Sequence, residues 1–115
     1  MWPQPFQLKP YEREIRAVWY CTLGGIDWPG HQYAQTEHKA SLQRQRLCED
    51  FDRLKAAGIN VILFQARVRG TVTYASEYEP WDGSISGTPG VPPPYDPLAF
   101  AIEEAHRRGM ELHAY

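Results

Sequence analysis

The chain has 115 residues, the length of one small domain, and its hydrophobic share of 43% is ordinary for a folded protein. Its 12 Lys and Arg residues against 14 Asp and Glu residues give a net charge of −2, which excludes the clustered positive charge of a nucleic-acid arm or a polybasic membrane segment. The longest apolar run, over residues 61–64, is too short to span a bilayer. We therefore expect neither nucleic acid as a partner nor a transmembrane segment.

The first predicted elements are an extended lead-in over residues 1–13 and a strand over residues 15–21. The lead-in is rich in proline and shows no periodic pattern, whereas residues 15–21 are rich in β-branched and aromatic side chains and contain no breaker. Two glycines end the strand, and a loop with Asp27 and Trp28 runs to about residue 36.

A helix is predicted over residues 39–57, because apolar side chains recur on one stripe: Ala40, Leu47, Phe51 and Leu54. Gly58 stands where a helix end favours glycine. Residues 60–67 form a mostly apolar run, which is typical of a parallel strand covered on both faces.

The stretch 70–95 is predicted to be a long irregular loop, and loops of this length in compact domains are usually functional or disordered. Aromatic side chains along it argue against disorder. Asp96 and Pro97 then provide an N-cap and a first-turn proline for a second helix, which Gly109 closes. Residues 110–115 begin a third strand.

The predicted order is β-α-β-α-β, which calls for a parallel sheet with right-handed helical crossovers. Both helix-to-strand connections are tight glycine turns, whereas both strand-to-helix connections are long. In parallel α/β folds the site lies on the strand-to-helix loops, at the carboxyl ends of the strands. We therefore expect functional side chains at that end of the sheet.

Side-chain alternation places polar residues on one face of the later strands. Gln65 and Arg67 share a face of the second strand, and His113 and Tyr115 share a face of the third, while the opposite faces are apolar. Polar inward faces favour a barrel interior that opens into a site, because an open doubly wound sheet needs apolar residues on both faces.

The same alternation predicts an ion pair at the bottom of the barrel interior. Glu111 lies inward on the third strand, and Arg16 takes the matching place on the first strand if Val18 and Tyr20 share its face. A buried charge requires a partner, so we expect Arg16 close to Glu111, with Trp19 facing outward.

The two cysteines, Cys21 and Cys48, are too few for a disulfide scaffold and lack metal-ligand spacing. The pattern allows a single disulfide but favours two half-buried free thiols. The third strand is poor in carboxylates and no second histidine stands at ligand spacing, so we expect no metal and no cofactor.

Five short segments carry a resemblance to a known family: 14–19 (EIRAVW), 25–29 (GIDWP), 57–61 (AGINV), 64–67 (FQAR) and 111–115 (ELHAY). With these segments the sequence resembles the glycosyl-hydrolase-like (β/α)8 barrel family, formerly a bacterial domain of unknown function, from about Glu14 to Tyr115. The resemblance implies a glycan as partner, and an exported protein of the bacterial periplasm or cell surface.

The resemblance implies the fold class α/β, as the start of a TIM (β/α)8 barrel with parallel strands. Such a barrel needs about 250 residues, so we expect residues 14–115 to be its N-terminal portion, truncated in the third strand. Glycosidases usually use two carboxylates that flank the scissile bond, and in barrel enzymes these commonly lie on later strands. We expect no catalytic residue in this fragment, no turnover from it alone, and self-association through its uncovered sheet face.

This segment is instead expected to supply residues that bind the substrate: Gln65, Arg67, His113, Tyr115, Asp27, Trp28 and Trp81. Gln65 and Arg67 suit a sugar hydroxyl or a catalytic carboxylate, with a structural hydrogen bond as the alternative. For His113 the alternative is a buried core histidine, and for Asp27 it is the capping of its turn. The tryptophan rings either stack on sugars or pack inside the loops.

The favoured interpretation is the N-terminal segment of a glycoside hydrolase-like protein that acts on a polysaccharide or a peptidoglycan-type glycan. A non-catalytic carbohydrate-binding barrel that has lost its acids is the alternative. A self-contained small α/β domain is disfavoured, because nothing follows the third strand to cover the inward face of the sheet.

Overall fold

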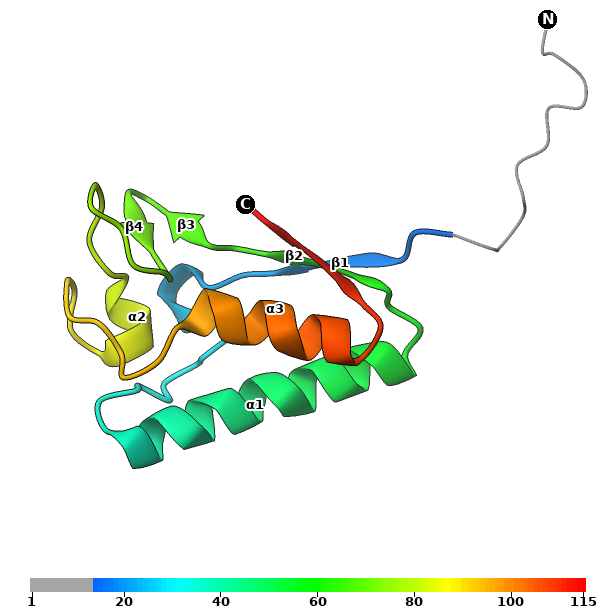
Figure 1. Ribbon diagram of the computed structural model, residues 1–115, viewed down its shortest axis with the longest axis horizontal. Coiled ribbons are helices and arrows are strands. Elements are labelled where there is room, and N and C mark those ends of the chain that lie inside the picture. The colour runs from blue at the N-terminus through cyan, green and yellow to red at the C-terminus, as the bar shows by residue number, and fades with distance from the viewer. Residues whose placement is uncertain (1–13) are drawn as a thin grey trace, which may run out of the picture.

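The computed structural model describes residues 14–115 (Figure 1), so the lead-in expected over residues 1–13 lies outside the described residues. In chain order the elements are β1 (Ala17–Tyr20), the 3-10 helix η1 (Leu23–Gly25), α1 (Glu37–Ala56), β2 (Val61–Phe64), β3 (Arg67–Val68), β4 (Thr71–Val72), α2 (Gly83–Ser86), α3 (Pro97–Arg107) and β5 (Glu111–Ala114). The order of β1, α1, β2, α3 and β5 confirms the predicted alternation of strands and helices. No helix in this part of the chain is long and apolar enough to cross a membrane.

Both long helices begin at side-chain caps and end at glycine turns. Thr36 accepts a hydrogen bond of 3.2 Å from the backbone N–H three residues ahead, at the start of α1, and Asp96 accepts one of 3.0 Å in the same way at the start of α3. Gly58 and Gly109 follow the helix ends with φ of 91° and 73°, a left-handed conformation that favours glycine. Each helix therefore returns directly to the next strand.

The three long strands form one parallel sheet in the order β1-β2-β5. Helices α1 and α3 lie on the same face of this sheet (Figure 1), where Tyr20, Ile62 and Phe64 pack into the buried core. Consecutive parallel strands with their helices on one face match the start of a barrel-like fold, whereas a doubly wound sheet has helices on both faces. The other face, which we call the open face, carries Trp19, Leu63 and His113 in one row across the three strands.

The side chains of β1 alternate in the opposite sense to the prediction. Tyr20 points toward α1, where its hydroxyl donates a hydrogen bond of 2.6 Å to Asp50, and Val18 packs against the same core. Trp19 lies on the open face and is 63% exposed. Because β1 is apolar on both faces, its sequence pattern alone does not show which face packs against the helices. The hydrogen bond to Asp50 on α1 fixes the side to which Tyr20 points.

The expected contact between Arg16 and Glu111 is therefore wrong. Arg16 lies at the amino end of β1, where its Nε donates a hydrogen bond of 2.5 Å to the carbonyl oxygen of Gly58 and its Nη1 pairs with Glu14 at 3.2 Å. Glu111 pairs instead with His113 of its own strand, with 3.1 Å between Oε1 and Nε2.

Four short elements, namely η1, β3, β4 and α2, were not predicted. The antiparallel strands β3 and β4 form a hairpin around Arg69 and Gly70, which have φ of 48° and 77°, and α2 is one turn capped by Asp82. These elements have two to four residues each, which is too short for a periodic pattern. Because β2 ends at Phe64, Arg67 belongs to the hairpin and not to the second strand as predicted.

Helices α1 and α3 are joined by a buried carboxylate. Glu104, only 6% exposed, accepts a hydrogen bond of 2.9 Å from Arg108 and pairs with Arg107 at 3.2 Å. The thiol of Cys48 on α1 donates to the same carboxylate at 3.5 Å. Cys48 and Cys21 are both free and half-buried, as the sequence favoured.

Candidate functional site

The carboxyl end of the parallel sheet is organised by Gln65, which follows β2. Its Oε1 accepts hydrogen bonds of 2.8 Å from the backbone N–H groups of Thr22 and Leu23, just after β1. The Thr22 hydroxyl donates to the backbone carbonyl of Gln65 at 2.9 Å. The oxygen of Gln65 thus makes structural hydrogen bonds, which was the alternative to a substrate contact. Its Nε2 makes no hydrogen bond among residues 14–115 and stays available as a donor.

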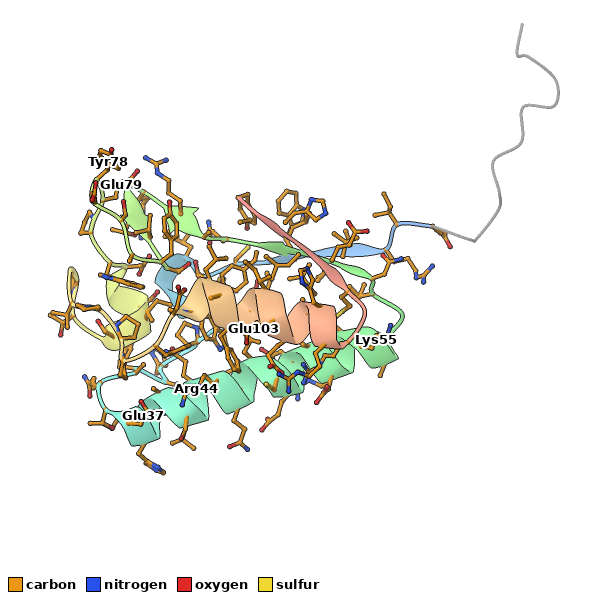
Figure 2. The ribbon with its side chains drawn as sticks, viewed as in Figure 1. Glu37, Arg44, Lys55, Tyr78, Glu79 and Glu103 are labelled. Atoms are coloured by element: carbon orange, nitrogen blue, oxygen red, sulfur yellow. The ribbon has the colours of Figure 1, made fainter. Side chains whose placement is uncertain are left out.

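Arg67 lies at the same end of the sheet, in the β3–β4 hairpin. Its Nε donates to both carboxylate oxygens of Glu79 at 2.8 Å, and this hydrogen bond, with the charge of Glu79, holds the pKa of Arg67 above its ordinary value. The two terminal nitrogens of Arg67 have no partner in the described part of the chain. Figure 2 shows Glu79 beside Tyr78, whose side chain is 90% exposed at the end of the molecule where the hairpin lies.

Tyr115 connects the ends of the three strands. Its backbone carbonyl accepts hydrogen bonds from the N–H groups of Ala66 at 2.7 Å and Arg67 at 3.1 Å. Its hydroxyl lies 3.3 Å from the thiol of Cys21, which follows β1. Partial burial, and then this hydrogen bond, raise the pKa of Tyr115 to about 12, so the hydroxyl is protonated at neutral pH.

His113 faces the open side of the sheet, as predicted, and is exposed in this structure. The described residues therefore do not place it among core side chains, which was the alternative for this residue. Its partner in this segment is Glu111, so the pair provides one polar strip along β5.

Asp27 caps its turn, which was the alternative to a contact with the substrate. Its Oδ2 accepts a hydrogen bond of 2.8 Å from the backbone N–H of Cys21, and its own N–H donates to the carbonyl of Cys21 at 3.1 Å. Asp27 also lines a pocket of about 260 Å³ at the edge of β1, together with Asp50, Arg53 and Leu54. This pocket lies on the side of β1 that has no neighbouring strand among residues 14–115.

Trp28 is not a sugar-stacking ring in this structure, which corrects the expectation. Its side chain is completely buried, and its Nε1 donates a hydrogen bond of 3.0 Å to the backbone carbonyl of Gln43. An indole packs well in a core when its N–H finds a partner. Trp81 is half-buried and forms an isolated parallel bridge with Val72 beside the hairpin, so part of its ring remains accessible.

Sequence reasoning missed Gln43, a fully buried side chain on α1 that holds two loops and the short helix α2. Its Nε2 donates to the backbone carbonyls of Gln32 at 2.8 Å and Ile85 at 2.9 Å, and its Oε1 accepts from the hydroxyl of Tyr95. The sequence signal that could have revealed its burial is the position of a polar residue within the apolar stripe that begins at Ala40.

Three acids near the carboxyl end of the sheet are already engaged, whereas Glu77 in the same loop is exposed and has no partner among residues 14–115. Asp27 caps Cys21, Glu79 binds Arg67, and Asp82 accepts hydrogen bonds from the hydroxyl of Thr71 at 2.9 Å and the N–H of Ser84 at 2.7 Å. Over residues 14–115 no three His, Cys, Asp or Glu side chains come together as a metal ligand set. The arrangement therefore offers hydrogen-bond donors and aromatic rings rather than a pair of free carboxylates.

The sequence matches the family described as glycosyl hydrolase-like 10 over residues 14–115. It is similar to the glycosyl hydrolase DigH of Escherichia coli (strain K12), with 33% identity over 114 residues that cover 96% of this chain and 26% of the relative. It is also similar to the glycosyl hydrolase YngK of Bacillus subtilis (strain 168), with 36% identity over 104 residues that cover 90% of this chain and 20% of the relative. The chain thus spans about a quarter of the length of these relatives or less.

Proposed function

Because this chain belongs to the glycosyl hydrolase-like 10 family, we propose that it is the N-terminal part of a (β/α)8-barrel glycoside hydrolase acting on a polysaccharide or a peptidoglycan-type glycan. The observation that carries this proposal is the meeting of Gln65, Arg67 and Tyr115 at the carboxyl end of a parallel sheet. That is the end where barrel enzymes hold their substrates.

In this proposal the segment binds the glycan and does not cleave it. Glycosidases usually need two carboxylates, one on each side of the scissile bond. Near this end Asp27, Asp82 and Glu79 are held by backbone amides, by a hydroxyl or by Arg67, so the described residues do not offer two free carboxylates there. The acid and its partner carboxylate then come from other strands of the barrel. Arg67, Gln65 and Tyr115 supply hydrogen bonds that orient the glycan toward them.

Arg67 is the residue of this segment that matters most for substrate binding. Glu79 fixes its Nε, while both terminal nitrogens have no partner among residues 14–115 and can donate to adjacent sugar hydroxyls or to a carboxylate. A guanidinium held at one nitrogen is already oriented before the substrate arrives. A Lys at this position would carry the charge without the planar pair of donors.

The test compares Arg67→Ala, Arg67→Lys and the control Arg69→Ala in the full-length protein, with purified peptidoglycan and soluble oligosaccharides as substrates. Losing a charged hydrogen bond costs about 1.5–3 kcal/mol, so Arg67→Ala should weaken binding or turnover roughly ten- to hundredfold. Arg67→Lys should recover little, and Arg69→Ala should behave as wild type.

Two outcomes bear on the proposal in different ways. Equal activity of wild type and Arg67→Ala, at equal thermal stability, would assign Arg67 a structural role only. Glycan binding without any turnover in the wild-type full-length protein would favour the non-catalytic carbohydrate-binding barrel. Absence of both binding and turnover with every glycan tested would contradict the proposed function itself.

A further inference from the structure

The open face of the sheet presents a large aromatic ring that the described residues cover only in part. Trp19 projects from β1 on the side away from α1 and α3 and is 63% exposed, although its neighbours in β1, Val18 and Tyr20, pack into the core. Hydrogen-bonded strand register places it level with Leu63 and His113. The ring therefore stands on the face that carries the polar residues of the carboxyl end.

The orientation of this ring is fixed by Tyr115. The two ring centroids are 4.9 Å apart and the planes meet at 85°, an edge-to-face contact. Tyr115 is itself held at both ends, by its hydroxyl against the thiol of Cys21 and by its backbone carbonyl, which accepts hydrogen bonds from Ala66 and Arg67. Trp19 and Tyr115 thus form a right-angled aromatic corner, with both rings partly exposed.

We propose that this aromatic corner binds one pyranose ring of the glycan, with Trp19 supplying the surface on which the sugar stacks. A pyranose has one face of C–H groups, which pack on a flat aromatic ring, and hydroxyls at its rim that need polar partners. The hydroxyl of Tyr115 is protonated at neutral pH and can donate a hydrogen bond. The backbone carbonyl of Tyr115 accepts a hydrogen bond of 3.1 Å from the N–H of Arg67. The corner is therefore continuous with the hydrogen-bonding residues of the carboxyl end.

This inference rests on the proposed function and deepens it, because it assigns the stacking role to Trp19 in place of the buried Trp28. The competing role for Trp19 is to fill the interior of a closed barrel. The two roles differ in what they require of the side chain: stacking requires a flat ring, whereas filling a core requires apolar volume.

The experiment replaces Trp19 by Phe, Leu and Ala in the full-length protein and measures binding of chitotetraose and cellotetraose, and pull-down on purified peptidoglycan. Trp19→Ala should weaken binding about tenfold or more, as expected for truncation of an aromatic anchor. Trp19→Phe should recover most of the affinity, and Trp19→Leu should not, although both keep apolar volume. The control Ile15→Ala removes another exposed apolar side chain, at the amino end of the sheet, and should leave binding unchanged.

Thermal melting of each variant separates binding from folding. Equal affinities for Trp19→Phe and Trp19→Leu, or an unchanged affinity for Trp19→Ala, would overturn the aromatic corner while wild-type binding upholds the proposed function. If Trp19→Ala fails to fold, the comparison of Phe with Leu still decides. A wild-type protein that binds none of these glycans would contradict the proposed function and the corner together.

Discussion

Single amide side chains hold the loops at the carboxyl end of the sheet. Gln65 is an example, because its side chain binds the backbone that follows β1. Its oxygen accepts two backbone N–H groups after β1, whereas its nitrogen has no partner among residues 14–115 and, in the proposed function, donates to the glycan. Substitutions that remove one role and keep the other can therefore distinguish a structural contact from a substrate contact.

Gln65→Ala is expected to lower the free energy of unfolding by about 1–2 kcal/mol, because the N–H groups of Thr22 and Leu23 lose their acceptor. Gln65→Glu keeps an acceptor oxygen and should retain most of that stability, but it loses the donor and should bind glycan more weakly. Denaturation and binding assays on the full-length protein measure both effects. A Gln65→Ala protein with wild-type stability would show that the loop does not depend on this residue.

Gln43→Ala should destabilise the protein by about 3 kcal/mol, because it leaves the carbonyl of Gln32 and the hydroxyl of Tyr95 without their partner in a buried region and removes one of the two donors to the carbonyl of Ile85. The matched control is Gln45→Ala on the same helix, an exposed residue whose amide reaches only Glu49 at 3.1 Å. Thermal or urea unfolding of the full-length protein checks the difference. Equal shifts for the two variants would contradict the assignment of Gln43 as the residue that holds these loops.

At the scale of elements, helix chemistry and strand composition predicted the parts of the fold that have long patterns. The Asp96 cap, the glycine turns and the apolar runs located α1, α3 and the three parallel strands to within a few residues. The hairpin and α2 were missed because strands of two residues and a helix of four residues are too short to show a repeated pattern. The facing of β1 was missed because the deciding partner, Asp50, is on another element.

The sequence predicted where on the sheet the candidate site lies better than it predicted what each residue does there. The end of the sheet was anticipated from the asymmetry of loop lengths, and the structure brings Gln65, Arg67 and Tyr115 together there. Whether a tryptophan is buried or exposed depends on contacts between distant segments, so the sequence pattern could not separate Trp28 from Trp19.

The contact between α1 and α3 should weaken in acid because of Glu104. The hydrogen bond from Arg108 is the main reason that the pKa of Glu104 lies below its ordinary value. A lowered folded-state pKa contributes stability that is present above the unfolded-state value and is lost as the pH falls through the folded-state value. The difference in unfolding free energy between wild type and Glu104→Gln should therefore shrink below about pH 4.5. A difference that stays constant from neutral pH into acid would refute this origin.

At the scale of the whole molecule, the described segment has one covered sheet face and one open one. Ile15, Trp19 and Tyr115 are exposed apolar side chains of the chain segments that form the open face, and β1 and β5 each have one edge without a strand partner among residues 14–115. Exposed apolar patches and free strand edges promote association.

The 115-residue chain, produced alone, should therefore be oligomeric or marginally stable, and it should show no glycosidase turnover. Sedimentation or light scattering measures its association, and calorimetry its unfolding. A monomer with a cooperative melt above about 60 °C, beyond the usual range for small mesophilic domains, would contradict this expectation. Trp19→Lys, which places a charge on the open face, should reduce the association.

The glycine turns after α1 and α3 also set where the chain can accept additional residues. An insertion at Gly58 or Gly109 would displace a helix relative to the strand that follows it and would disrupt the packing of the core. The chain near Gly90 differs: residues 87–92 are all exposed, and nothing lies within 4 Å of the position that a Cβ at Gly90 would take. A fluorescent label or an affinity tag inserted beside Gly90 would report on the carboxyl end of the sheet from outside, with the two turns at the other end of the sheet left intact.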